Sequence, residues 1–169
     1  MPKIKKIYSR EIIDSRGNPT IECDVTLEDG SFGRASVPSG ASTGVHEALE
    51  LRDKDNNRFF GKGVQKSVSN INDKISKEIN KLDFESIKSF DNFLINLDGT
   101  ENKSNLGANA TLAASIAFAK SLANLTSTTF YQHIAQNEDF LLPVPMMNII
   151  NGGSHADNDV DIQEFMIAP

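Results

Sequence analysis

Thr20-Ile21-Glu22-Cys23-Asp24-Val25-Thr26-Leu27-Glu28 alternates apolar and polar side chains without a break. Because successive side chains of a β-strand point to opposite faces, this stretch predicts an antiparallel strand with one buried face. The turn signal Asp29-Gly30 follows it, and residues 31–37 are predicted to return as the second strand of a hairpin. The β-branched stretch 4–13 is predicted to pair with this hairpin. The first third of the chain therefore indicates an antiparallel sheet.

Beyond residue 63 the apolar side chains recur with a helical period. A first amphipathic helix is predicted from apolar residues three or four positions apart, namely Val64, Val68, Ile71, Ile75 and Ile79. A second, shorter helix is predicted from Ile87, Phe90, Leu94 and Leu97. Asp98-Gly99 is expected to end that helix. Asn109 is predicted to cap the N-terminus of a third helix, whose many alanines indicate close packing on several sides. Residues 129–136 predict a short fourth helix.

After residue 140 the pattern changes to short strands. Pro143 and Pro145 forbid a continuing helix. The apolar run 146–150 predicts a strand covered on both faces, and residues 161–168 predict another strand. The chain stops at Pro169 with no helix beside these strands, which is a poor place for a domain to end.

Composition and charge narrow the class of protein. The 169-residue chain has 17 basic and 23 acidic residues, a net charge of −6 and no basic block. This balance disfavours binding to nucleic acid or to an anionic membrane. Cys23 is the only cysteine, so no internal disulfide can form and a reducing compartment is expected. Because no apolar run approaches the ~20 residues that span a bilayer, we expect a cytoplasmic protein without a membrane span.

Three places could carry chemistry. Loop 39–44, Ser-Gly-Ala-Ser-Thr-Gly, could cradle a phosphate with its backbone or offer oxygens to Mg²⁺. It lacks the Lys-Ser/Thr pair of a P-loop, and the pattern alone favours an ordinary loop. His155 follows a predicted strand in a glycine-rich loop, where an imidazole can contact an anionic substrate or act as an acid or base. The alternative for His155 is a surface side chain beside Asp157 and Asp159.

The third place is Asp161-Ile162-Gln163-Glu164. On a strand, Glu164 would share a face with Ile162 and Met166, so its carboxylate must be paired, protonated or placed at a strand end. Parallel α/β folds place their ligands at the C-terminal ends of strands. His46 with Glu47 is too small a set for a metal site, and Cys23 is expected to be a core residue without reactivity.

Seven motifs resemble the sequence of enolase and occur in the same order along the chain. They are DSRGNPT at 14–20, PSGASTG at 38–44, EALELRD at 47–53, LDGTENK at 97–103, GANA at 107–110, PVPMMNIINGG at 143–153 and DIQEFM at 161–166. The resemblance implies an α+β N-terminal domain over residues 1–140, with a three-stranded antiparallel meander followed by helices. It also implies that residues 141–169 begin an α/β, TIM-like barrel that is truncated in this chain.

The resemblance further implies a glycolytic lyase that reversibly dehydrates 2-phosphoglycerate to phosphoenolpyruvate with two Mg²⁺ ions. Ser42 matches a serine of a mobile loop that closes over the substrate and gives an oxygen to the second Mg²⁺. His155 matches a histidine of a second mobile loop that closes near the substrate phosphate. Gln163 and Glu164 match a pair in the substrate pocket, with the glutamate near the departing hydroxyl. Catalytic roles are therefore expected for Glu164 and His155, substrate binding for both and for Gln163, and metal binding for Ser42.

Some groups that the family requires have no match in this chain. Its lysine base, its general-acid glutamate and its three carboxylate metal ligands belong to later barrel segments. We therefore expect the full-length parent to be an active enzyme, and the 169-residue chain alone to lack turnover and a high-affinity Mg²⁺ site. The parent is expected to be a homodimer or higher homo-oligomer. Arg10 and Glu22 are candidates for ion pairs between its subunits.

Two other functions stay open. The chain can be a non-catalytic N-terminal fragment that serves as a binding or dimerisation module, and a stop codon after Pro169 would favour this alternative. It can also be a general phosphate-binding domain that uses loop 39–44. The motifs argue against the phosphate-binding domain, because such a domain would not need segments 98–103 and 143–153. The strand-like segments at the end expose apolar faces, so the isolated chain is expected to aggregate.

Overall fold

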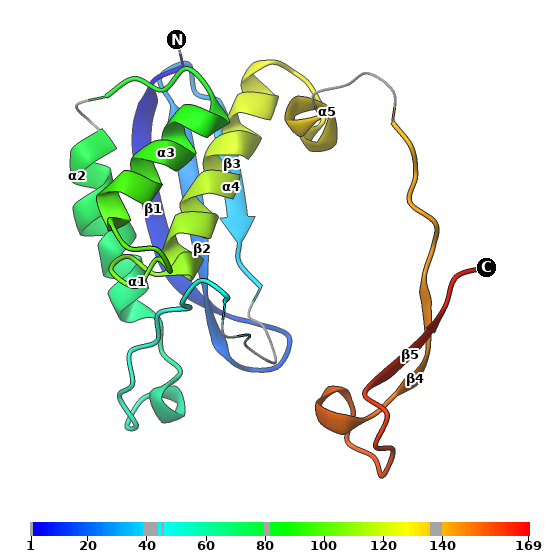
Figure 1. Ribbon diagram of the computed structural model, residues 1–169. Helices are drawn as coiled ribbons and strands as arrows, with labels where there is room; N and C mark the ends of the chain where they lie inside the picture. Colours follow the sequence, from blue (N-terminus) through cyan, green and yellow to red (C-terminus); the bar gives the residue numbers. More distant parts are fainter. Residues whose placement is uncertain (1, 39–43, 45, 80–81, 136–139) are drawn as a thin grey trace. The chain divides into compact units, whose positions relative to one another are not determined.

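The computed structural model of the chain describes residues 2–38, 44, 46–79, 82–135 and 140–169. These residues divide into two compact units, a larger one that ends at Ala135 and a smaller one that contains the residues after it. Figure 1 shows the elements of both units, and each unit is described separately below.

The larger unit begins with the predicted three-stranded antiparallel sheet. Its strands follow the order of the sequence, β1 (Ile4–Ile13), β2 (Pro19–Leu27) and β3 (Phe32–Ser36). Cys23 in the middle of β2 lies opposite Ser9 on one side and Ala35 on the other. The apolar side chains of the alternating segment are buried, as predicted, and they are Ile21, Cys23, Val25 and Leu27.

The first predicted helix exists but is not a uniform α-helix. It runs through α1 (Gln65–Ser69), a π-helical segment η2 (Asn70–Ile75) and α2 (Ser76–Ile79), and a 3₁₀ turn, η1 (Phe59–Gly61), precedes it. The predicted apolar stripe faces inward, since Val64, Ile71, Ile75 and Ile79 are buried and Val68 packs against the core. The periodicity therefore identified the buried face without revealing the wider turn in the middle.

The second helix is confirmed at both ends. It is α3 (Ile87–Asp98), which Ser86 caps by accepting a hydrogen bond from the backbone N–H of Ser89. Gly99 ends it in the left-handed conformation, with φ 71°, which glycine adopts without steric cost. The predicted short helix at 129–136 is α5 (Phe130–Ile134), with Thr129 at its N-cap.

The long helix α4 (Ala108–Leu125) corrects one prediction. Its N-cap is Gly107, so Asn109 lies inside the first turn instead of capping it. The side chain of Asn109 is 3% exposed and reaches another segment. Its Oδ1 accepts from the backbone N–H of Leu51 at 3.2 Å, and its Nδ2 donates to the Leu51 carbonyl at 3.1 Å. Asn109 thus holds the loop before α1 against α4.

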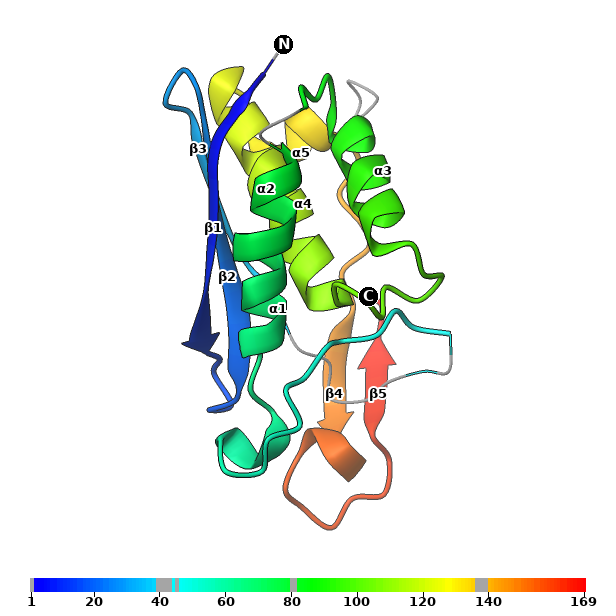
Figure 2. The same cartoon turned by 90° about the vertical axis from the view of Figure 1, so that its left-hand side faces the viewer.

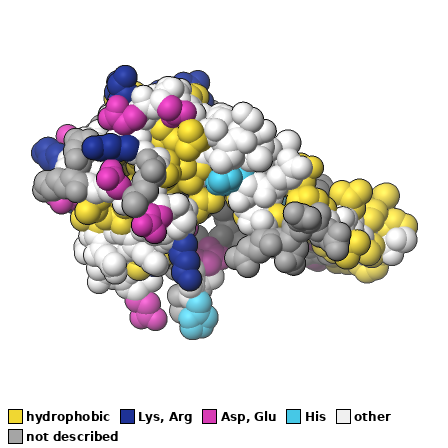
Figure 3. Space-filling model, turned by 90° about the horizontal axis from the view of Figure 1, so that it is seen from above, with side chains coloured by type: hydrophobic (Ala, Val, Ile, Leu, Met, Phe, Trp, Pro, Cys, Tyr) yellow, Lys and Arg dark blue, Asp and Glu magenta, His cyan; other side chains and the backbone are white. Residues whose placement is uncertain are grey.

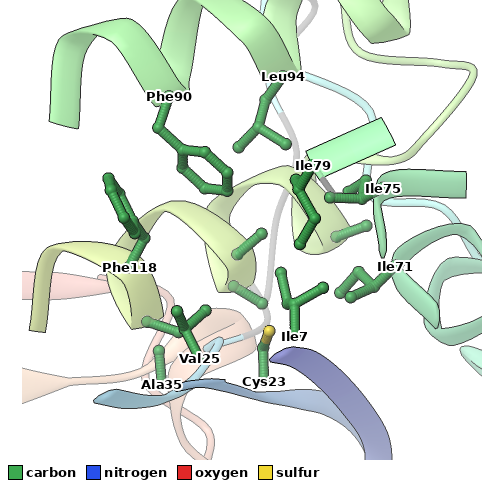
Figure 4. Close-up of a cluster of buried hydrophobic side chains, with 14 of the residues drawn as sticks. Ile7, Cys23, Val25, Ala35, Ile71, Ile75, Ile79, Phe90, Leu94 and Phe118 are labelled. Carbon is green, nitrogen blue, oxygen red and sulfur yellow. The ribbon is translucent and has the colours of Figure 1, made fainter. Parts of the chain in front are cut away.

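The helices cover one face of the sheet. Helix α4 lies over β2 and β3, while α1, η2 and α2 lie over β1. Figure 2 shows α3 packed on the far side of these helices from the sheet. The hydrophobic core of Figure 4 lies between the sheet and the helices. In this core the ring centroids of Phe90 on α3 and Phe118 on α4 are 4.6 Å apart. In the view of Figure 3, lysine and arginine side chains lie among aspartates and glutamates instead of forming one basic patch.

The smaller unit contains a two-stranded antiparallel sheet. Strand β4 (Met147–Asn151) pairs with β5 (Glu164–Ile167), and a 3₁₀ turn, η3 (Gly153–His155), lies in their connection. Two predictions change here. The apolar run is not covered on both faces, because the described residues give β4 a single partner strand and its side chains are largely exposed. The second strand starts at Glu164, three residues later than the pattern suggested.

Candidate functional site

The connection between β4 and β5 brings together His155, Gln163 and Glu164. The Nδ1 atom of His155 lies 2.9 Å from Oε1 of Glu164, and its Nε2 atom lies 3.0 Å from Nε2 of Gln163. These residues meet because the antiparallel register places Asn151, at the end of β4, opposite Glu164, at the start of β5. The three residues assigned to the substrate pocket by resemblance therefore form one hydrogen-bonded group, called the His155 cluster below.

Gly152 makes the tight start of this connection possible. A Cβ atom on Gly152 would lie 2.2 Å from the carbonyl oxygen of Val160 and 2.7 Å from that of Ile162. The backbone uses this closeness, since the N–H of Gly152 donates to the Gln163 carbonyl at 3.0 Å. The N–H of Gly153 donates to the Val160 carbonyl at 2.8 Å. These two backbone hydrogen bonds fix the start of the loop that carries His155.

Asn158 is a second anchor, which the sequence analysis did not identify. Its Nδ2 donates to the carbonyl oxygen of Asn151 at 2.9 Å, and its Oδ1 accepts from the N–H of Val160 at 3.0 Å. An asparagine in a loop favours such local bonds to the backbone. That preference was the available signal, but it does not distinguish Asn158 from other loop asparagines.

The ionisable pair in the cluster is partly open to water. The side chain of His155 is 28% exposed and that of Glu164 is 37% exposed. Pairs exposed to this degree add little to stability. The prediction that Glu164 must be paired or at a strand end is met in both ways, because it is the first residue of β5 and contacts His155.

The cluster can hold and move a proton. A carboxylate accepts hydrogen bonds, an imidazole can both donate and accept, and an amide supplies either a donor or an acceptor. Side chains of these three types can contact a polar or anionic substrate and transfer a proton at its reacting group.

The fit to Mg²⁺ is poorer. Within the described ranges, no three side chains of His, Cys, Asp or Glu lie close enough together to hold a metal ion. Ser42, the predicted metal ligand, lies outside the described residues. His46 and Glu47 line a hollow of about 590 Å³ with Ala48, Glu101 and Asn102, and they too form no such metal group.

The structure describes Cys23, and it also shows the intrachain contacts of Arg10 and Glu22, whose pairing between subunits stays a prediction. Cys23 is buried, and burial raises the pKa of its thiol to about 12, as expected of a core residue and not of a nucleophile. Arg10 and Glu22 pair with each other within one chain, with Nη2 and Oε1 2.5 Å apart. The carboxylate of Asp24 also accepts from Arg10, at 2.8 Å, and from Arg34, at 2.6 Å. Both candidates for ion pairs between subunits are thus already paired internally.

The helices of the described part of the chain include none that is both long and apolar enough to cross a membrane. Residues 4–134 match the family described as "Enolase, N-terminal domain". Residues 139–169 match the one described as "Enolase, C-terminal TIM barrel domain". The first match contains the sheet and all the helices packed on it, and the second contains the His155 cluster. The matches extend over most of the chain in the order that the seven motifs predicted, and the chain belongs to the enolase family.

Proposed function

We propose that this chain forms part of the active site of an enzyme that reversibly dehydrates 2-phosphoglycerate to phosphoenolpyruvate with Mg²⁺. The observation that carries the proposal is the His155 cluster, where the residues assigned by resemblance to substrate binding and proton transfer lie within hydrogen-bond distance. Membership of the enolase family supports the reaction class.

In this proposal Glu164 lies beside the hydroxyl that leaves the substrate. Its carboxylate accepts a hydrogen bond from that hydroxyl and holds it in position for departure. Gln163 orients the substrate through its amide, and His155 contacts the phosphate side of the substrate with its imidazole. Closure of the loops around these groups would exclude water and strengthen each of these interactions.

Mg²⁺ would stabilise the negative charge that develops on the substrate when it is bound. Ser42 is proposed as one ligand, and the remaining ligands and the lysine base are expected from barrel segments without a match in residues 1–169. We also propose a cytoplasmic homodimer or higher homo-oligomer, which family membership and the single buried thiol support.

A chimera tests this proposal. Residues 1–169 would replace the corresponding residues of a complete enolase, and phosphoenolpyruvate formation from 2-phosphoglycerate would be measured. The chimera is expected to turn over, and Glu164→Gln is expected to lower its kcat by about 100-fold or more. Asp161→Asn, the same change at an exposed position nearby, is the matched control and should retain activity.

A folded, inactive chimera would contradict the proposal, as would equal kcat values for the Glu164 variant and the parent chimera. The isolated 169-residue chain is expected to show no turnover. Turnover by that chain would refute the assignment of the base to a segment outside it. Binding of 2-phosphoglycerate by the chain together with an inactive chimera would favour the non-catalytic module instead.

A further inference from the structure

The imidazole ring of His155 meets a different group at each of its two nitrogen atoms. The carboxylate oxygen of Glu164 lies 2.9 Å from Nδ1. The amide nitrogen of Gln163 lies 3.0 Å from Nε2. Both distances are those of ordinary hydrogen bonds. The two neighbours therefore restrict where the ring can carry its proton.

The contact with Glu164 determines whether Nδ1 of His155 carries a hydrogen. An ionised carboxylate has no proton to donate, so the hydrogen bond exists only if Nδ1 carries the hydrogen. The opposite tautomer, with hydrogen on Nε2 alone, would turn the lone pair of Nδ1 toward the negative oxygen of Glu164. That arrangement loses a charge-assisted hydrogen bond and adds repulsion between lone pairs.

The contact with Gln163 determines whether Nε2 of His155 carries a hydrogen. Its amide nitrogen is a donor only, so it satisfies Nε2 when that nitrogen has a free lone pair. At the other end of the amide, the hydroxyl of Ser154 lies 3.5 Å from Oε1 of Gln163, and a hydroxyl can donate to that oxygen. Donors and acceptors then alternate from Ser154 through Gln163 and His155 to Glu164.

We propose that Gln163 and Glu164 are positioning residues that hold His155 in the Nδ1–H tautomer and leave Nε2 as the only ring nitrogen able to accept a proton. A proton on Nε2 would face the N–H of Gln163, so the amide must turn over and present Oε1 instead. The charge of His155 and the orientation of the Gln163 amide are therefore coupled. The use of this arrangement in catalysis rests on the proposed function, in which the imidazole of His155 contacts the substrate.

The tautomer can be measured without any substrate in the 169-residue chain, at a concentration below that at which the chain aggregates. Nitrogen-15 NMR of chain labelled at histidine separates ring nitrogens that carry hydrogen from those that do not. When the ring of His155 is neutral, we expect it to show a protonated Nδ1 and an unprotonated Nε2. His46, which is exposed, gives an internal reference for a ring in water.

Two substitutions change the neighbours one at a time. Gln163→Glu places an acceptor at each ring nitrogen, so both nitrogens are expected to carry hydrogen at the pH where the unmodified chain shows one. Glu164→Gln offers Nδ1 an amide that can donate, so the ratio of the Nδ1–H to the Nε2–H tautomer is expected to fall at least tenfold. Asp161→Asn, again a carboxyl-to-amide change, is the control and should leave the ratio unchanged.

The proposal is overturned if His155 in the unmodified chain shows the same ring shifts as His46. Equal responses to the changes at 161 and 164 would also overturn it. Contacts between the backbones of Asn151 and Glu164, read in the same samples, report whether the β4–β5 pair has formed, and their absence from the unmodified chain counts against the proposal. Because turnover is not measured here, an inactive chimera would refute the proposed function and leave the tautomer assignment standing.

Discussion

Gly33 of β3 lies so close to Ala117 of α4 that a Cβ atom on Gly33 would stand 2.1 Å from the Ala117 carbonyl oxygen. It would stand 2.4 Å from the backbone nitrogen of Ser121. Both neighbours are helix backbone, which cannot rotate away as a side chain can. Gly33 has no side chain, and α4 carries small side chains. Together they allow the helix to pack directly on the sheet.

Gly33→Ala is therefore expected to destabilise the larger unit. Since α4 or β3 must shift to admit one methyl group, the free energy of unfolding should fall by about 2–3 kcal/mol. Urea denaturation followed by circular dichroism measures this change. Lys5→Ala, at an exposed position of β1 in the same sheet, should cost less than about 1 kcal/mol. Similar losses at the two positions would contradict the close approach.

The hydrogen bonds of Asn109 to Leu51 give a second prediction. It distinguishes a role in capping α4 from a role in holding the Leu51 segment against α4. Serine is as good an N-cap as asparagine, so Asn109→Ser would be neutral if capping were its role. Because serine cannot reach both the N–H and the carbonyl of Leu51, we expect it to lower the free energy of unfolding by about 2 kcal/mol. Thr129→Ser, at the N-cap of α5, should be nearly neutral, and urea unfolding of both variants decides the question.

The sheet and the helices could be predicted from the sequence because each shows in the spacing of apolar residues over a short segment. The π-helical segment could not, because its apolar side chains keep an α-helical spacing and its contact with β1 joins residues far apart in the sequence. Within it, Asn72 accepts from the N–H of Ser9 at 2.8 Å and donates to the Ser9 carbonyl at 3.0 Å. These bonds satisfy backbone groups of β1 at the edge of the sheet.

In the candidate site too, the sequence identified single residues, whereas the contacts between them depend on the fold. The resemblance identified His155, Gln163 and Glu164 one by one, but their mutual hydrogen bonds depend on the register of β4 with β5. A shift of that register by one residue would turn Glu164 to the other face. Asn158 and Ser154 were missed because asparagine and serine are common in loops, and only the folded connection shows what they contact.

Acid should weaken the larger unit through Asp24. Hydrogen bonds from Arg34, and next from Arg10, outweigh burial and hold the pKa of Asp24 at about 2, below its ordinary value of 3.8. A carboxyl group with a lowered pKa in the folded state stabilises above the unfolded pKa and loses that stabilisation as the pH falls.

We therefore expect the contribution of Asp24, about 1 kcal/mol after allowance for the exposed Arg34, to disappear between about pH 4 and pH 2. Urea unfolding across this range measures it. Asp24→Asn should flatten the pH dependence there by the same amount. An equally steep dependence in the variant would show that other carboxyl groups account for it.

The last prediction concerns two adjacent glycines that are required for different reasons. Gly152 has no room for a side chain, since a Cβ would lie 2.2 Å from the Val160 carbonyl oxygen, but its φ of −153° suits any residue. Gly153 has room, with its nearest atoms 3.5 Å away, but its φ of 54° lies in the left-handed region. Asparagine tolerates that region better than other residues with a side chain.

We therefore expect Gly153→Asn to keep the bond between His155 and Glu164, and Gly152→Ala to break it by displacing the Val160 and Ile162 carbonyls. In the chimera, Gly152→Ala should lower kcat by up to about 100-fold, because a displacement of about 1 Å in a catalytic group has effects of that order. Gly153→Asn should stay within about threefold of the parent. The ring shifts of His155 provide the matching structural readout in the 169-residue chain. Retained activity in the alanine variant would mean that the loop can form with the Val160 carbonyl moved aside, and that the close approach at Gly152 does not set the position of His155.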